Sequence, residues 1–166
     1  MDLKDLKEDS QDFLSAEELG SIFADALLEV ISTVSGFSFY GIPSLPEEDS
    51  DFDDMIGIMN LTGGKNNIMF FISAREEVMR VLCSYMSGVE QSEISKEDMY
   101  DSLCEIVNMT AGNAKLRIGG TDYMFTLSVP FAIKGDNMSI IIKKRMNSFT
   151  KVLGNEEVSV KLKIVY

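Results

Sequence analysis

A long amphipathic segment near the N-terminus constrains the fold of this chain most strongly. Apolar residues recur from Leu19 to Val34 at the three- and four-residue spacings of an α-helix, and they form one continuous stripe. Ser15 and Glu18 have the spacing of a capping box, and Gly36 is placed to end the helix. Because such a stripe must be buried against another element, we expect this helix to pack on a sheet.

The remaining apolar patterns predict strands and two further helices. Helices are expected at 75–86 and 98–118. Six strands are expected, at 37–42, 55–61, 67–73, 123–129, 138–145 and 158–165. The predicted fold class is α+β, with two long helices and a shorter one packed on a mostly antiparallel sheet of about six strands. We expect a single domain over residues 13–166, preceded by a flexible acidic N-terminus over residues 1–12.

A faint internal repeat relates the two halves of the chain. Each half contains a long helix followed by a strand that ends in an aliphatic residue and proline, and aligning these prolines gives an offset of 87 residues. This offset superposes Glu18 on Glu105 and Ser21 on Asn108. The pattern suggests a duplicated helix–strand–strand unit.

Composition excludes several functional classes. The net charge of −12 opposes binding to nucleic acid, because an acidic surface repels the phosphate backbone. The only basic cluster, at 143–145, lies within an apolar strand pattern. No apolar run is long enough to span a membrane, and the charged N-terminus lacks a signal peptide, so we expect a cytoplasmic protein. The absence of histidine removes Ser-His-Asp and Cys-His catalysis. The acidic segment 46–54 lacks the spacing of a calcium-binding loop and is interpreted as a solvated loop.

The helix expected at 98–118 has two contrasting faces. On a helical wheel its polar face spans about 80° and its apolar face about 140°. The polar face contains Asp101, Glu105, Asn108, Gly112 and Lys115. The apolar face, which we expect to meet the core, contains Met99, Leu103, Ile106, Val107, Ala111, Ala114 and Ile118.

Two features of the polar face indicate a protein partner. Gly112 costs about 1 kcal/mol relative to alanine in mid-helix, and no core contact explains it, whereas a backbone approaching from outside would. Glu105 has no cation three or four residues away, and Asp101 is a like charge. The alternative interpretation is an ordinary solvent-facing strip with a tolerated glycine.

The sequence around this face resembles a known family. The segment Glu105-Ile-Val-Asn108-Met-Thr-Ala-Gly112-Asn-Ala-Lys115, followed by Ser128-Val-Pro130 and Gly135, resembles the CheX branch of the CheC/CheX/FliY chemotaxis phosphatases. The resemblance extends loosely over about 150 residues, and its specific part is the helix motif. It agrees better with CheX, which carries one such helix, than with CheC, which carries two.

The resemblance implies an activity and a partner. A protein of this family docks on a phosphorylated CheY-like receiver and hydrolyses its aspartyl phosphate. Asn108 would orient the attacking water, and Glu105 would pair with a lysine of the receiver. Asp101, Gly112 and Lys115 would contact the partner. No cofactor is expected in this chain, because Mg²⁺ would be supplied by the receiver. The family also implies a homodimer that joins sheets, for which the C-terminal strands could supply an edge.

Two other classes of function stay open from the sequence. The chain could be a scaffold like the middle domain of the flagellar switch protein FliM, or a module that binds a receiver without hydrolysis. The paired residues Glu105 and Asn108 favour the enzyme, because a pure scaffold has no evident need of them.

Overall fold

Three helices and seven strands form the described part of the chain. The computed structural model describes residues 14–36, 38–41, 52–63, 66–119, 124–139, 141, 146–155 and 158–166. The α-helices are α1 (Ala16–Ser35), α2 (Glu76–Ser87) and α3 (Lys96–Ile118), with a short 3₁₀ turn, η1 (Gln91–Glu93), before α3. The strands are β1 (Tyr40–Gly41), β2 (Met55–Gly63), β3 (Asn66–Ala74), β4 (Thr126–Leu127), β5 (Phe131–Lys134), β6 (Ser148–Gly154) and β7 (Ser159–Val165). The predicted α+β class is confirmed.

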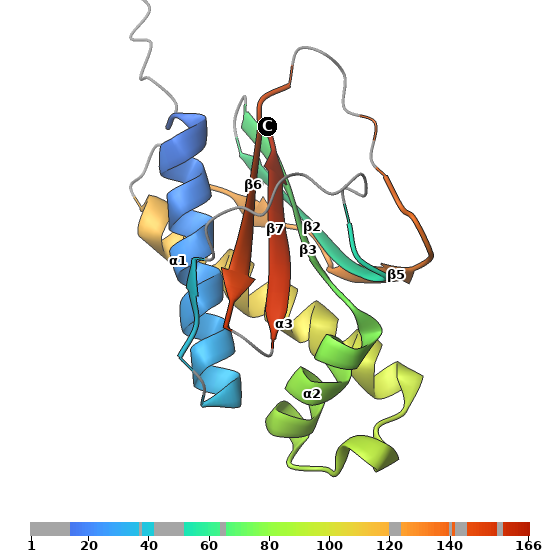
Figure 1. The fold of residues 1–166 in the computed structure, drawn as a ribbon. Coiled ribbons are helices and arrows are strands. Elements are labelled where there is room, and N and C mark those ends of the chain that lie inside the picture. The colour runs from blue at the N-terminus through green and yellow to red at the C-terminus, as the bar shows by residue number, and fades with distance from the viewer. Residues whose placement is uncertain are drawn as a thin grey trace, which may run out of the picture.

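All seven strands belong to one sheet, in which every pairing is antiparallel. The order is β1-β6-β7-β3-β2-β4, and β5 also pairs with β2 (Figure 1). The helix α1 contacts β6, and α3 contacts both β2 and α1. No helix among the described residues is long and apolar enough to cross a membrane.

The sheet order has the symmetry expected of a duplicated unit. Exchanging β1, β2 and β3 for β4, β6 and β7 reproduces the same order read backwards. The two helix–sheet contacts are also equivalent, since α1 lies on β6 and α3 lies on β2. The structure therefore relates α1 to α3, in agreement with the predicted duplication.

The two equivalent helix–sheet contacts each include a glycine, which lies on the helix in one contact and on the strand in the other. Where α1 meets β6, the ring of Phe149 from β6 packs against Gly20 of α1. Where α3 meets β2, the side chains of Val107 and Leu103 from α3 pack against Gly57 of β2. Gly20 and Val107 are positions that the 87-residue offset superposes. Each glycine allows a helix to approach its strand closely.

The second face of the sheet also carries a cluster of buried side chains, which was not predicted. Phe52 is buried on this face beside Phe71, with ring centroids 5.4 Å apart, and the ammonium of Lys163 lies 5.3 Å from the Phe52 ring. Asp53 forms an ion pair with Lys161 at 3.2 Å. The prediction of a solvated loop at 46–54 is therefore wrong for the last three residues; residues 46–51 lie outside the described part.

Several expected strand bounds need correction. The strand expected at 138–145 is wrong for residues 138, 139 and 141, which are not in a strand, and the rest of that range lies outside the described residues. The chain instead forms β5 earlier and β6 later. The strands expected at 37–42 and 123–129 shorten to β1 and β4, with Phe37, Ile42 and Tyr123 undescribed. The expected N-terminal segment 1–12 and the basic cluster at 143–145 also lie outside the described residues.

The proposed source of an open sheet edge also changes. The C-terminal strand β7 lies between β3 and β6, so it cannot supply an edge. Among the described residues, the strands with one unpaired side are β1, β4 and β5, together with the part of β6 before Leu153. On β5, Phe131 and Ile133 are 49% and 41% exposed, so this edge carries apolar side chains.

Candidate functional site

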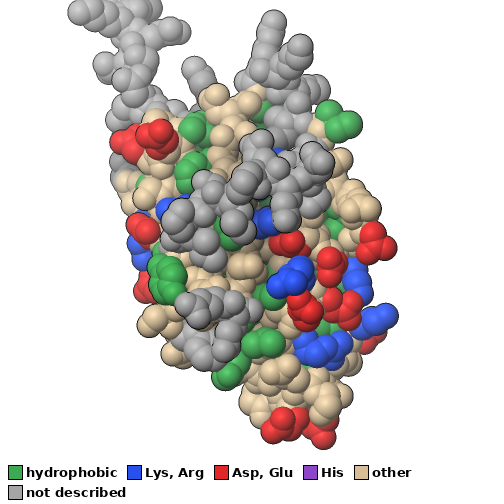
Figure 2. Space-filling model, viewed as in Figure 1, with side chains coloured by type: hydrophobic (Ala, Val, Ile, Leu, Met, Phe, Trp, Pro, Cys, Tyr) green, Lys and Arg blue, Asp and Glu red, His purple; other side chains and the backbone are tan. Residues whose placement is uncertain are grey.

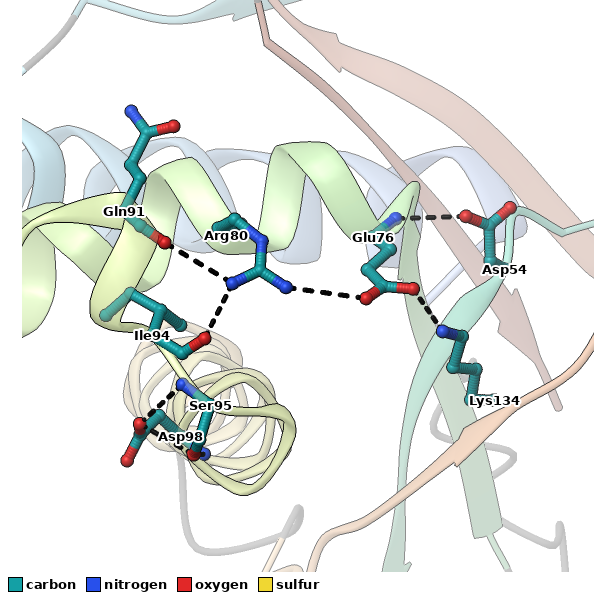
Figure 3. Close-up of polar contacts among 8 residues, drawn as sticks. All are labelled: Asp54, Glu76, Arg80, Gln91, Ile94, Ser95, Asp98 and Lys134. Atoms are coloured by element: carbon teal, nitrogen blue, oxygen red, sulfur yellow. Dashed lines mark hydrogen bonds and ion pairs between the residues drawn. The ribbon is translucent and has the colours of Figure 1, made fainter.

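The helix α3 is held in place at its N-terminal end by a capping box and by a network of partly exposed charged side chains. The side chain of Ser95 accepts a hydrogen bond from the backbone of Asp98, and Asp98 accepts from the Ser95 backbone in return. Arg80 of α2 donates to the carbonyl oxygens of Ile94 at 2.6 Å and Gln91 at 3.3 Å, immediately before the cap (Figure 3). The start of α3 is therefore fixed relative to α2.

The same network continues from Arg80 to the sheet. Glu76 pairs with Arg80 and with Lys134 of β5, and its backbone N–H donates to Asp54 (Figure 3). The Lys134 ammonium lowers the pKa of Glu76, and Glu76 in turn raises the pKa of Lys134. Figure 2 shows acidic and basic side chains intermixed over the start of α2. Because these charges satisfy one another, we assign the cluster a structural role.

The buried face of α3 agrees with the helical wheel. All seven residues expected to face the core are buried. Thr110 is also fully buried, and its hydroxyl has no hydrogen-bond partner among the described residues. Burial of Thr110 was not predicted, although its position falls within the apolar arc. The arc therefore predicted burial better than residue polarity did.

The opposite face of α3 presents the five predicted site residues together. Asp101, Glu105, Asn108 and Lys115 are exposed, and Gly112 is half-buried. Among the described residues, none of these side chains forms a hydrogen bond or an ion pair. We call this set the α3 strip. Its polar groups are therefore available to a partner.

Gly112 differs from the other glycines whose surroundings the structure describes. A Cβ atom at Gly57 would lie 2.5 Å from the Val107 side chain, and Gly36 and Gly88 have positive φ angles of 71° and 70°. Gly112 has neither constraint: its φ angle is not positive, and no atom of the described residues lies within 4 Å of an added Cβ. Intramolecular packing thus gives no reason for glycine at this position, as the wheel predicted.

Cys104 borders the α3 strip and was not predicted as part of it. Burial raises the pKa of its thiol, and the nearby Asp101 carboxylate raises it further. A raised pKa keeps the sulfur protonated and weakly nucleophilic at neutral pH. The described residues contain no group of three or more acidic or thiol side chains placed to hold a metal ion.

The Ser128-Val-Pro130 segment has a structural explanation. Ser128 donates its backbone N–H to the carbonyl of Asn60 at 2.9 Å, and its hydroxyl accepts from the Asn60 N–H at 3.0 Å. The pairing register with β2 shifts by one residue between β4 and β5, so the segment forms a bulge. Pro130 is tolerated at this bulge because proline has no backbone N–H to donate to the strand ladder.

The α1 residue equivalent to Glu105 is engaged in a capping box. Glu18 accepts hydrogen bonds from the backbone and hydroxyl of Ser15, and these bonds lower its pKa, the backbone bond most. The interpretation of Glu18 as a capping residue is therefore confirmed. With Ser21 where α3 has Asn108, the first half presents no such pair.

Comparison with known families identifies the chain. The family model described as chemotaxis phosphatase CheX matches residues 55–152, which is more than half of the sequence. The chain belongs to the CheX family. A comparison with curated proteins finds no match.

Solved structures of CheX-like proteins share the fold. CheX from Vibrio vulnificus is 18% identical, with a TM-score of 0.77, covering 92% of this chain and 98% of the other. A CheC-like superfamily protein from Shewanella sp. PV-4 is 22% identical, with a TM-score of 0.75 and coverages of 89% and 96%. A chain of the CheX–CheY–BeF₃–Mg²⁺ complex from Borrelia burgdorferi is 19% identical, with a TM-score of 0.65 and coverages of 87% and 96%. At these identities the similarity shows the fold.

Proposed function

We propose that this CheX-family protein hydrolyses the aspartyl phosphate of a CheY-like receiver through Glu105 and Asn108 of α3. The observation that carries the proposal is that these two side chains lie one helical turn apart on an exposed strip. Both lack a partner among the described residues. Membership of the chemotaxis phosphatase family supports the reaction class.

The chemistry suits an asparagine rather than a titrating base. An aspartyl phosphate is a reactive acyl phosphate, so its hydrolysis depends mainly on water positioning and charge stabilisation. The carboxamide of Asn108 can both donate to and accept from a water molecule, and it does not titrate. In this proposal Asn108 enters the receiver's active site and orients the attacking water toward phosphorus. The absence of histidine from the sequence then has no consequence for the reaction.

Glu105 is assigned the docking role. Its carboxylate would pair with a lysine of the receiver, and the two charges would become desolvated when the proteins meet. Mg²⁺ belongs to the receiver in this scheme, and the Borrelia complex combines CheX with CheY, BeF₃ and Mg²⁺. We accordingly propose no cofactor for this chain.

Neutralising Glu105 tests the docking role. We expect Glu105→Gln to raise the receiver concentration at half-maximal rate by roughly 10- to 100-fold, because one charge of a desolvated pair is left unpaired. Steady-state phosphate release at varied concentrations of phosphorylated receiver measures this effect. Glu17→Gln, an exposed acidic residue in the first turn of α1, is the matched control. An unchanged half-saturating concentration for Glu105→Gln would show that Glu105 makes no such pair.

The proposed reaction itself is tested by the decay of a phosphorylated receiver in Mg²⁺ with and without this protein. Faster decay supports hydrolysis, and unchanged decay with every receiver from the same cell supports a scaffold. Slower decay indicates that the chain binds and shields the phosphate. The last two outcomes contradict the proposal.

We also propose that the protein is a cytoplasmic homodimer that joins its sheets at the β5 edge. Phe131 and Ile133 are partly exposed there, and β5 pairs with β2 on one side only among the described residues. We expect Phe131→Glu to convert the dimer to a monomer in sedimentation experiments. A wild-type protein that sediments as a monomer at high concentration would exclude this arrangement.

A further inference from the structure

A large apolar side chain extends the α3 strip toward the C-terminal end of the helix. Leu116 is 80% exposed, although most aliphatic residues of α3 are buried. It follows Glu105 by 11 residues, so it lies about 20° from Glu105 around the helix and about 16 Å further along its axis. Leu116 therefore points to the same side as the proposed catalytic pair.

No side chain projects from the helix at Gly112, which lies between Glu105 and Leu116. Gly112 is half-buried, and among the described residues nothing lies within 4 Å of an added Cβ, so a side chain of a partner has room beside the helix at this turn. Leu116 is one turn beyond it, and Lys115 beside it is exposed without an ion pair among the described residues. The result is an apolar side chain next to a bare stretch of helix with charged side chains around it.

The turn that carries Leu116 is held against the rest of the protein. Arg117 forms an ion pair with Glu29 of α1 at 2.6 Å. Ala114 and Ile118, which flank Leu116 in sequence, are buried in the core. Leu116 is thus presented on an ordered surface, which lowers the entropic cost of docking.

The catalytic pair alone offers too little surface for a specific complex. Stable protein–protein interfaces bury about 800 Å² on each partner, whereas Glu105 and Asn108 occupy a single helical turn. Such interfaces have an apolar centre with a polar rim. A single exposed leucine is ordinary on a protein surface. Its continuity with the α3 strip and with Gly112 is what distinguishes Leu116.

We propose that Leu116 is the apolar anchor by which this protein binds the phosphorylated receiver. This inference rests on the proposed function. The occupant is the receiver rather than a second copy of this chain, because a copy seated on the strip would cover Asn108 and block the reaction. Leu116 sets affinity and takes no part in bond breaking.

The test is direct binding to a receiver loaded with beryllium fluoride and Mg²⁺, measured by calorimetry. We expect Leu116→Glu to weaken binding by about tenfold or more, because the change places a charge where the proposed interface buries an apolar side chain. In phosphate-release assays the same variant should raise the half-saturating receiver concentration while the maximal rate stays within about twofold. Val89→Glu, a change at a 38%-exposed residue beyond the C-terminal end of α2, is the matched control and should bind as wild type does.

Each outcome separates this inference from the proposed function. Unchanged binding by Leu116→Glu, together with loss of activity in Asn108→Ala, would overturn the anchor and leave the phosphatase assignment intact. Failure of the wild-type protein to bind any receiver from the same cell would overturn both. A change in self-association without a change in receiver binding would assign Leu116 to an interface between copies of this chain.

Discussion

Replacing Asn108 by alanine is expected to reduce the catalysed rate of receiver dephosphorylation by about 100-fold, with little change in stability. The size of the effect is that of losing one group that positions a reactant or stabilises the transition state. Asn108 is exposed and has no partner among the described residues, so its removal should change the free energy of unfolding by no more than about 0.5 kcal/mol. Single-turnover phosphate release, with this protein in saturating excess over the phosphorylated receiver, measures the first quantity, and urea unfolding measures the second.

Two further variants sharpen this prediction. Asn108→Asp keeps the shape of the side chain but places a negative charge beside the phosphoryl group, so it should be as inactive as alanine. Asn113→Ala removes a half-buried asparagine about 140° around the same helix, so the maximal rate should be retained. Full acceleration by Asn108→Ala would show that another group positions the water.

Replacing Gly57 by alanine is expected to lower the free energy of unfolding by about 1–3 kcal/mol. A Cβ at this position would lie 2.5 Å from Val107 and 2.9 Å from Leu103, both on the buried face of α3. The helix must move away from β2 to accept it. Because Asn108 follows Val107, the shift should also weaken phosphatase activity. Thermal and urea unfolding followed by circular dichroism measure the loss of stability.

The same substitution at Gly112 is the matched comparison and should have the opposite sign. Alanine is favoured over glycine in a helix by about 1 kcal/mol, and an added Cβ at Gly112 would meet no atom of the described residues within 4 Å. Gly112→Ala should therefore raise stability while weakening receiver binding, because it fills the bare surface of the α3 strip. If Gly57→Ala were also stabilising, the close approach of α3 to β2 would be wrong.

The helices and the candidate site were predictable because their signals are local. The Ser15–Glu18 capping box, the glycine at position 36 and the apolar arc of α3 all depend on spacing within one helix. The helical wheel placed Glu105 and Asn108 together on the face opposite this arc, and both are exposed in the structure. Leu116 was equally visible on the wheel, at about 20° from Glu105, but an exposed leucine carries no distinctive signal in a sequence.

The strand neighbours were less predictable because pairing depends on distant residues. The apolar run at 138–142 is typical of a strand, yet a strand forms at 131–134, where Phe131 pairs with Ile58 of β2 and Lys134 with Met55. Phe52 belongs to an acidic segment whose charges favour solvent, and only its contact with Phe71 across the second face of the sheet explains its burial. Alternation predicts which face is buried, but not which strand lies alongside.

The most direct test of the phosphatase assignment is phosphate release with the phosphorylated receiver in large molar excess over this protein, in Mg²⁺. Catalysis predicts that each molecule of protein releases many molecules of phosphate, faster than the receiver loses phosphate alone. Release no faster than spontaneous decay would contradict hydrolysis by the Glu105–Asn108 pair. Release that is slower, by an amount proportional to the protein added, would show that the chain only binds the phosphorylated receiver.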